Sequence, residues 1–164
     1  MSFMQINDQV LIDRLNQVAD RLFDTSPLAA AIAGTFATVT DDNFDHGGRP
    51  EWAGRSVTTL KIYERKGIKF GGVLQASGEL RARVVTSNTQ DEAMISNNMP
   101  YAAAMQFGIK QGASGKTTRG APIPFGDIPA RPYMPMDKDG FLQPEAEQEV
   151  FLDVDHYWHK IFTP

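Results

Sequence analysis

The chain begins with apolar residues at helical spacing. These are Ile6, Val10, Leu11, Leu15, Val18 and Leu22. The spacing predicts a helix from about Asp8 to Phe23, because residues three and four apart share one helix face. Ser2 with Gln5 fits a capping box at its start, and Asn7 or Asp8 is an alternative N-cap.

A second helix is predicted directly after the first. Ser26 as N-cap and Pro27 at the first helical position mark its start. Its apolar stripe consists of Leu28, Ile32, Phe36 and Val39. The stripe continues toward Phe44, although Gly34 and three nearby threonines lower the helix propensity of the middle. A glycine pair at 47 and 48 then ends the helical pattern.

A short third helix is predicted in the middle of the chain. Ser56 is a suitable N-cap, and the helix would run through Lys66. We expect Leu60 and Tyr63 to face inward, with the basic side chains of the helix outward. Glycines at 67, 71 and 72 follow and predict a loop.

A β-hairpin and another short helix come next. Apolar and polar residues alternate over 80–86, which predicts a half-buried strand. Residues 92–96 form the second strand, and 87–91 form the hairpin loop between them. A short helix is predicted over 101–107, and Gly108 suits its C-cap.

The C-terminal residues predict a last helix over 143–162. Pro144 opens it, and three glutamates near its start match the positive end of the helix dipole. Its apolar seam consists of Val150, Val154, Tyr157 and Ile161. The apolar face is widened by Phe151, Trp158 and Phe162.

This order of elements predicts the α+β class: N-terminal helices, a small antiparallel β-sheet, a long loop and a C-terminal helix. We expect a single domain over 1–164. Within it, 8–45 would be the helical region, 46–142 the α+β core and 143–162 the C-terminal helix.

The long loop covers residues 109–127, which show no periodicity and are rich in glycine and proline. It carries Lys110, Lys116 and Arg119, with no acid before Asp127. Structureless loops of this length are uncommon in compact domains and are usually functional or disordered. We therefore predict that this segment, called the basic loop below, is mobile in the free subunit.

Composition narrows the classes of function. With 164 residues, the chain can bury roughly 70% of its unfolded surface as one domain. Its net charge of −4 argues against electrostatic nucleic-acid binding by the whole protein. The absence of cysteine excludes disulfides, thiolate zinc sites and cysteine nucleophiles. No signal-peptide pattern or bilayer-length apolar run is evident, so we expect a soluble, cytoplasmic protein.

Two motifs resemble binding sites found in enzymes, one for a nucleotide phosphate and one for a metal ion. Residues 112–118 resemble a phosphate-binding P-loop, but Lys110 stands where its first glycine belongs. A flexible basic loop is the better interpretation. His156 and His159 lie one helical turn apart near two aspartates, which is one possible metal-binding pattern. A surface or interface histidine pair is favoured, and we expect no metal, no cofactor and no catalytic triad.

A proline-rich stretch follows the basic loop. Pro129, Pro132 and Pro135 recur every three residues, the period of a polyproline II helix, so their rings would share one face. Prolines donate no backbone hydrogen bond, so the stretch is expected at a surface or a sheet edge. Its stiff backbone presents the guanidinium of Arg131, which suits bidentate pairing with a carboxylate. The partner could lie within the subunit or across an interface.

Four segments occur in an order and spacing that resemble the phage virion morphogenesis, or tail completion, family. They are Asn43-Phe44 with Trp52, Val73 to Leu80, Tyr101 to Gly108, and Ile128 to Tyr133. The resemblance runs from about Ser26 to Tyr133. The family tends to carry Pro-x-Gly-x-x-Trp before its tryptophan. Here those elements are rearranged over 47–52, so the turn is expected to differ.

The resemblance implies a structural virion protein without catalytic residues. It implies a role in completing the tail and joining it to the head, as a homomeric ring, for example a hexamer, at the head-proximal end. The implied partners are copies of itself, tail tube proteins, head-connector proteins and, non-specifically, DNA in the channel; no membrane is involved. The implied location is the tail or neck of the virion, after assembly in the host cytoplasm.

Eleven positions match the family pattern and are assigned packing or assembly roles. They are Trp52, Leu74, Gly78, Leu80, Tyr101, Ala102, Phe107, Gly108, Pro129, Arg131 and Pro132. We expect Trp52 to be buried, and Gly78 to have a positive φ or a close backbone neighbour.

Two alternatives remain at this point. A peptide-presenting adaptor would offer Pro129 to Pro132 to an aromatic groove, and the stretch would then be exposed. A metal-dependent enzyme would use His156 and His159.

Overall fold

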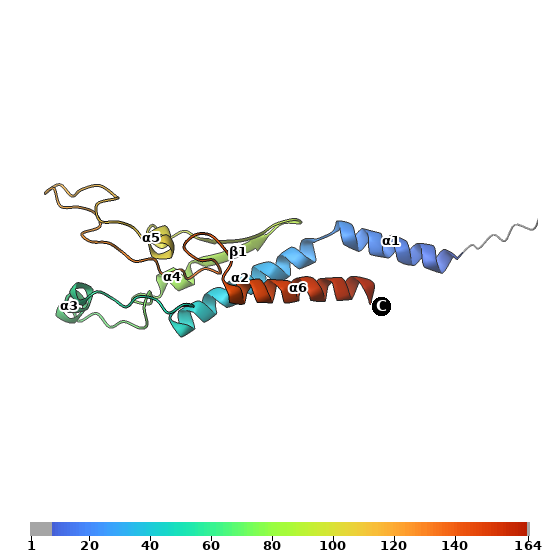
Figure 1. Ribbon diagram of the computed structural model, residues 1–164, viewed down its shortest axis with the longest axis horizontal. Coiled ribbons are helices and arrows are strands. Elements are labelled where there is room, and N and C mark those ends of the chain that lie inside the picture. Colours follow the sequence, from blue (N-terminus) through green and yellow to red (C-terminus); the bar gives the residue numbers. More distant parts are fainter. Residues whose placement is uncertain (1–7, 164) are drawn as a thin grey trace, which may run out of the picture.

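Helix α2 (Ser26–His46) is the spine of the molecule. The computed structural model describes residues 8–163. In it, α2 contacts helix α6 (Pro144–Phe162) and a hairpin of strands β1 (Val84–Asn88) and β2 (Ala93–Asn97). Figure 1 shows the hairpin and α6 along opposite sides of α2 in this view. Helices combined with a small antiparallel sheet confirm the α+β class.

Helix α1 (Gln9–Phe23) confirms the first prediction almost to the residue. Asp8 caps it by accepting a 3.1 Å hydrogen bond from the backbone N–H of Leu11. The alternative caps Ser2 and Asn7 lie outside the described residues. None of the residues of α1 is buried, and the helix extends away from the body (Figure 1).

The start of α2 differs slightly from the prediction. Thr25, not Ser26, is the N-cap residue, and the hydroxyl of Ser26 instead donates to Asp24. The middle stays helical because α6 and the hairpin pack on α2. The hydroxyls of Thr38 and Thr40 donate to carbonyls one turn earlier, at 3.2 and 2.7 Å. This satisfies the hydroxyls within the helix.

The fully buried side of α2 is lined mostly by small or polar residues: Ala29, Ala33, Val39, Thr40, Asn43 and Phe44. The larger predicted residues Leu28, Ile32 and Phe36 are only half-buried. Small residues fit here because α6 and the hairpin both approach the same helix. The hydroxyl of Thr35 also donates to Asp153 of α6 at 2.6 Å.

Helix α3 (Val57–Lys66) begins as predicted, with the Ser56 hydroxyl accepting from the N–H of Thr59 at 3.2 Å. The predicted inward face is wrong, because α3 buries no residue and Leu60 is exposed. Tyr63 packs instead on Phe70 in the loop that follows, with 5.1 Å between ring centroids. The helix therefore packs locally, away from the core.

The predicted strand over 80–86 is wrong in its first half. Gly78, at φ 76°, starts a single helical turn, α4 (Glu79–Ala82), and β1 begins only at Val84. Alternation was ambiguous here, because positions 80 and 84 are also one helical turn apart. The helical turn directs Arg81 to α2, where it pairs with Asp41 at 2.8 Å and also with Asp45. The positive φ expected at Gly78 is confirmed.

The hairpin itself is confirmed, with small shifts. β1 and β2 are antiparallel, and Thr86 is paired with Ile95. The connecting residues are 89–92 rather than 87–91, closed by a 2.9 Å bond from the Thr89 N–H to the Glu92 carbonyl.

Helix α5 (Ala102–Phe107) also agrees with the prediction and ends at Gly108. Gly108 has φ 73° and ψ 166°, so it is not in the usual left-handed helical cap conformation. A Cβ at this position would lie 2.7 Å from the backbone nitrogen of Ala130. Glycine is required here both by its φ and by this close approach of two backbones.

The basic loop is not structureless, which corrects the prediction. Its two arms are bonded to each other, beginning with Ile109 and Ile128, which exchange backbone hydrogen bonds of 3.0 and 2.8 Å. Farther out, the Ser114 N–H donates to the Ile123 carbonyl at 2.8 Å. Lys110 pairs with Asp127 at 2.9 Å, so Lys116 and Arg119 carry most of the outward charge.

Helix α6 confirms the C-terminal prediction, with Pro144 in its first turn and acidic residues near its start. Ala146 and Ile161 are buried, and the rest of the predicted seam is half-buried. No single helix within residues 8–163 is long and apolar enough to cross a membrane. By length and composition alone, α1 and α2 would do so only as a pair bent by 43°.

Candidate assembly site

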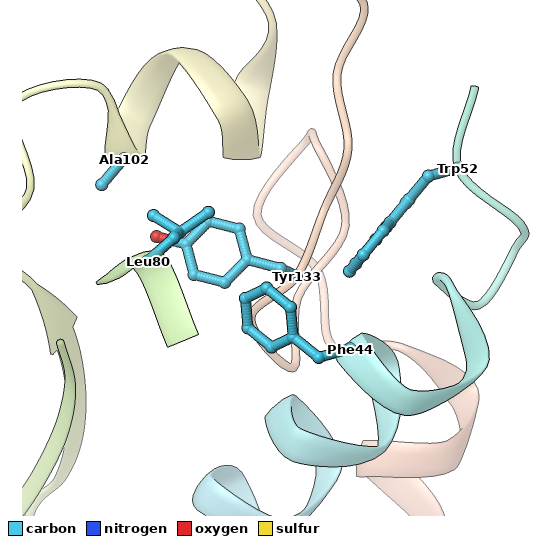
Figure 2. Close-up of a cluster of buried hydrophobic side chains, with 5 residues drawn as sticks. All are labelled: Phe44, Trp52, Leu80, Ala102 and Tyr133. Carbon is cyan, nitrogen blue, oxygen red and sulfur yellow. The ribbon is translucent and has the colours of Figure 1, made fainter. Parts of the chain in front are cut away.

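Three of the eleven matched positions meet in one buried cluster with two further residues of the family segments. Its members are Phe44, Trp52, Leu80, Ala102 and Tyr133. Figure 2 shows the tyrosine ring at the centre, with the phenylalanine and tryptophan on one side and the leucine and alanine near its hydroxyl. The ring of Phe44 lies 5.7 Å from that of Trp52 and 5.5 Å from that of Tyr133, centroid to centroid. The predicted burial of Trp52 is confirmed.

The other matched positions are divided between the core and the surface. Leu74 packs against the cluster and has φ 64°, the only positive φ outside glycine in residues 8–163. Tyr101, Phe107 and Pro129 are exposed, and Pro132 is half-buried. The exposed members can contact other molecules, whereas the core members support the fold.

Residues 131–136 run through this core and bend at 134 and 135. Burial alternates along it, with Arg131, Tyr133 and Pro135 buried and the residues between them half-buried. The period is therefore two, not three, and Pro129, Pro132 and Pro135 do not share one environment. The expected surface or sheet-edge position is wrong for this part of the stretch. A buried backbone without strand neighbours needs other hydrogen-bond partners.

Gln106 of α5 is the partner of three of these backbone groups. Its side-chain oxygen accepts from the N–H groups of Tyr133 at 2.9 Å and Met134 at 3.1 Å. Its side-chain nitrogen donates to the carbonyl of Met136 at 2.9 Å. One buried glutamine thus replaces a neighbouring strand for three backbone groups. Nothing in the sequence pattern singled out this residue, although it lies within a family segment.

Asn43 of α2 holds the same segment from the opposite side. Its amide nitrogen donates to the Tyr133 carbonyl at 3.2 Å and to the side chain of Gln143 at 2.8 Å. Its oxygen accepts from Arg49 at 3.0 Å. This network ties α2 to the residue that precedes α6, and every polar atom of the asparagine side chain is used.

Trp52 is the third side chain that holds residues 131–136. Its indole N–H donates to the carbonyl of Pro132 at 2.9 Å. The ring lies directly over Gly48, where a Cβ would be 2.3 Å from it. The rearranged glycines before Trp52 therefore make room for the indole ring.

Arg131 is 8% exposed, and its partners differ from those predicted. Its Nε donates to the carbonyl of Ala53 at 2.7 Å and one terminal nitrogen donates to that of Gly54 at 2.9 Å. No carboxylate within residues 8–163 pairs with it, so of the two alternatives for the carboxylate partner the one within the subunit is not found, and the one across an interface stays a prediction. Burial, and then the positive charge of Arg55, lower the pKa of Arg131. A buried Arg131 also contradicts an exposed Pro129–Pro132 peptide for an adaptor.

Tyr133 is fully buried, and its hydroxyl is the only buried side-chain polar atom in the described residues without a hydrogen-bond partner. Burial, and secondarily Tyr101, raise the pKa of Tyr133 to about 12. The stability that depends on a neutral Tyr133 is therefore fully present below the unfolded-state pKa of about 10. That contribution is lost as pH rises through about 12.

We expect Tyr133→Phe to raise the free energy of unfolding by about 1 kcal/mol, because it removes an unpaired buried hydroxyl. The alkaline loss of stability should also become shallower. Urea denaturation at neutral pH and at alkaline pH measures both effects, with Tyr63→Phe on α3 as control, because Tyr63 is only half-buried and does not affect the pKa of Tyr133. A Tyr133→Phe variant that is less stable than wild type would mean that the hydroxyl has a partner.

Two surfaces at one end of the molecule are apolar and uncovered. On α1, which we call the α1 surface, the exposed residues are Val10, Leu11, Ile12, Leu15, Leu22 and Phe23. On α6, the α6 surface consists of Phe151, Leu152, Trp158 and Phe162. Val10 and Phe23 are 78% and 80% exposed. Exposed apolar surfaces of this kind usually mark contacts with other proteins.

The structure does not support a nucleotide site at residues 112–118 or a metal site at His156 and His159. His156 and His159 are exposed on α6, and residues 8–163 contain no group of three or more His, Cys, Asp or Glu side chains placed to hold a metal ion. Residues 112–118 form turns in the basic loop and do not lead into a helix, as a P-loop would.

The chain has a small α+β fold, a buried core held by side-chain hydrogen bonds and two uncovered apolar surfaces. These features are typical of subunits that assemble with other proteins. The chain belongs to the phage virion morphogenesis family, whose model matches residues 6–157. It is 31% identical over 152 residues to the Mu-like prophage FluMu G protein 2 of Haemophilus influenzae, covering 93% of this chain and 91% of that protein. It is 31% identical over 147 residues to a protein of Escherichia phage Mu named "Putative capsid assembly protein G", covering 87% and 83%. No solved structure matches the chain.

Proposed function

We propose that this protein completes the phage tail and joins it to the head, as a homomeric ring at the head-proximal end of the tail. The role is structural and not enzymatic. Membership of the virion morphogenesis family supports it. The ring is inferred from the α1 surface, because none of the 15 residues of α1 is buried.

A helix of this kind gains little from its own chain. Its apolar side chains face water, and its described contacts with α6 are near its C-terminal end, where the Tyr157 hydroxyl donates to the Arg21 carbonyl at 2.8 Å. Isolated helices of about 15 residues are marginal in water. In the proposed ring, the α1 surface packs on a neighbouring copy and becomes part of a shared core.

The basic loop has a separate role in this proposal. It extends from the body beside α5 (Figure 1), and its outward cations are Lys116 and Arg119. We place it toward the channel of the ring, where it contacts DNA or an acidic neighbour without sequence preference. Deleting residues 112–120 should leave thermal melting unchanged and lower the yield of joined particles. Full joining by the deletion variant would remove this role.

The ring is tested by particle mass. Wild type should scatter light as a multiple of the 18.1 kDa chain and should decorate one end of isolated tails in electron micrographs. The double variant Leu11→Glu, Leu15→Glu should remain monomeric at the same concentration, because it places charges in the apolar contact. Its melting temperature should change little, since both side chains are already exposed.

Gln17→Glu is the matched control, because it adds charge to a polar position of the same helix. It should assemble as wild type does. A monomeric wild type, or a double variant that keeps the parent mass, would contradict the assignment of the α1 surface.

A further inference from the structure

A cavity of about 400 Å³ is lined by residues of α3 and α5, among others. Figure 1 shows these two helices at the end of the molecule away from α1. Residues from the segments 55–63, 73–80, 101–105 and 127–131 line the cavity. Its apolar lining includes Val73, Leu74, Leu80, Met105 and Ile128. Two guanidinium groups, those of Arg55 and Arg131, also line it. This volume fits two or three side chains of a peptide better than a single ion.

The two arginines have no carboxylate partner in the described chain. Arg131 uses its donors on the carbonyls of Ala53 and Gly54, and Arg55 uses two of its donors on the carbonyls of Gly71 and Gly72. Carbonyls position a guanidinium but do not neutralise it. The guanidinium of Arg55 also lies 4.4 Å from the ring centroid of Phe70, a cation–π contact that attracts the charge but does not neutralise it. Partly buried charges are ordinarily paired with an opposite charge, so these two arginines are open to an anion.

The single acid in the lining does not supply that anion. Asp127 already accepts from the Nζ of Lys110 at 2.9 Å and from the backbone N–H of Gln111 at 2.8 Å. These two hydrogen bonds lower the pKa of Asp127, the backbone bond first. Asp127 is thus held in the basic loop, and the cavity keeps an excess of positive charge.

Two further features point in the same direction. Ser56, Thr59 and Tyr63 line the cavity, so one face of α3 borders it, and the hydroxyl groups on this face can donate hydrogen bonds to a bound anion. Leu74, which also lines the cavity, has the strained φ of 64°. Strained backbone outside glycine is concentrated at ligand sites, where the surrounding structure maintains it.

We propose that this cavity binds an extended acidic peptide segment of another virion protein, with one carboxylate against Arg55 and Arg131 and a flanking apolar side chain against Leu74 and Met105. The source of the segment rests on the proposed function, whereas the peptide chemistry rests on the cavity alone. The apolar lining favours a peptide with apolar side chains over a nucleic-acid backbone. Helix α1 of a second copy is a poorer occupant, because a 15-residue helix is about 10 Å across with its side chains and is too wide for a cavity of about 400 Å³.

The binding test uses the full chain and a set of blocked tripeptides. Each peptide has Asp at the centre and Leu, Val, Phe or Tyr on either side, and a matched set has Asn instead. We follow the Nε–H signals of the arginines by NMR during titration. The Asp peptides should bind with Kd values below about 1 mM, a weak affinity suited to so small a ligand. Their Asn counterparts should bind about tenfold more weakly, because the charge is lost.

Two variants of α3 locate the site. Thr59→Trp places a large ring in the cavity and should weaken the binding of the Asp peptides at least tenfold. Thr58→Trp is the control, since the neighbouring side chain is exposed and does not line the cavity. Arg131→Lys keeps a positive charge but loses the planar fork, so it should weaken binding less than Thr59→Trp.

Equal binding of the Asp and Asn sets, or no binding by any of the peptides, would overturn the proposal. So would tighter binding of inorganic phosphate or short single-stranded DNA at the same arginines. In particles, Thr59→Trp should lower the yield of joined heads and tails while its mass by light scattering stays that of wild type. The peptide result therefore stands or fails independently of the ring and of the joining role.

Discussion

Replacing Trp52 by alanine is expected to lower the free energy of unfolding by about 3–5 kcal/mol, the usual cost of removing a large buried aromatic side chain. The indole is 5% exposed and packs edge-on against Phe44. Its removal also takes the hydrogen-bond donor from the carbonyl of Pro132. Both losses occur in one cluster, and Gly48 beside the ring has no side chain that could fill the cavity.

Trp158→Ala is the matched control, because that tryptophan lies on the exposed α6 surface. Its effect on an isolated subunit should remain below about 1 kcal/mol. Chemical denaturation followed by far-UV circular dichroism compares the two variants. Fluorescence would be confounded, since each variant removes one of only two tryptophans. Equal stability of Trp52→Ala and wild type would mean that the indole does not hold the core.

The second large effect is expected for Gln106→Met, which keeps the length of the side chain but removes its polar atoms. Three backbone groups would lose their partners: the N–H groups of Tyr133 and Met134 and the carbonyl of Met136. Each unsatisfied buried group costs about 1–3 kcal/mol. Because Met136 is half-buried and water can reach part of this region, we expect a total of about 3–5 kcal/mol.

Gln111→Met in the basic loop provides the comparison. Gln111 is exposed, and its side chain makes one bond, to the carbonyl of Phe125 at 2.7 Å. Its replacement should change the free energy of unfolding by less than about 0.5 kcal/mol. If Gln106→Met changed the free energy of unfolding as little as Gln111→Met, Gln106 would not be what satisfies the buried backbone of residues 131–136.

The helices were predictable because their signals are local. Asp8 and Ser56 cap α1 and α3 from within one turn, and Gly47 ends α2 with a left-handed φ of 74°. The apolar seam of α6 repeats every three to four residues and needs no distant partner to be recognised. The strand predicted at Leu80 was wrong because the residues there fit both the period of a strand and that of a helix. The ion pairs of Arg81 with α2 favour the helical turn.

The candidate sites were predictable only in part. Trp52 was expected to be buried on account of its size, and Arg131 was singled out by the prolines around it, but neither pattern specifies what the side chain contacts. The partners of Arg131 are carbonyls 77 and 78 positions away in the chain. The second guanidinium of the cavity, that of Arg55, carried no signal in the sequence at all.

The sequence by itself determined the helices, the hairpin, the apolar character of both termini and the family, because each of these depends on neighbours in the chain or on the order of short segments. Only the tertiary structure decided that residues 131–136 cross the core. Prolines lack an N–H, so the segment could lie at an edge or, equally, be buried if side chains satisfied the remaining groups. Asn43, Trp52 and Gln106 do so from three separate elements. A hydrogen bond between distant residues leaves no periodic trace in the sequence, so this arrangement could be found only in three dimensions.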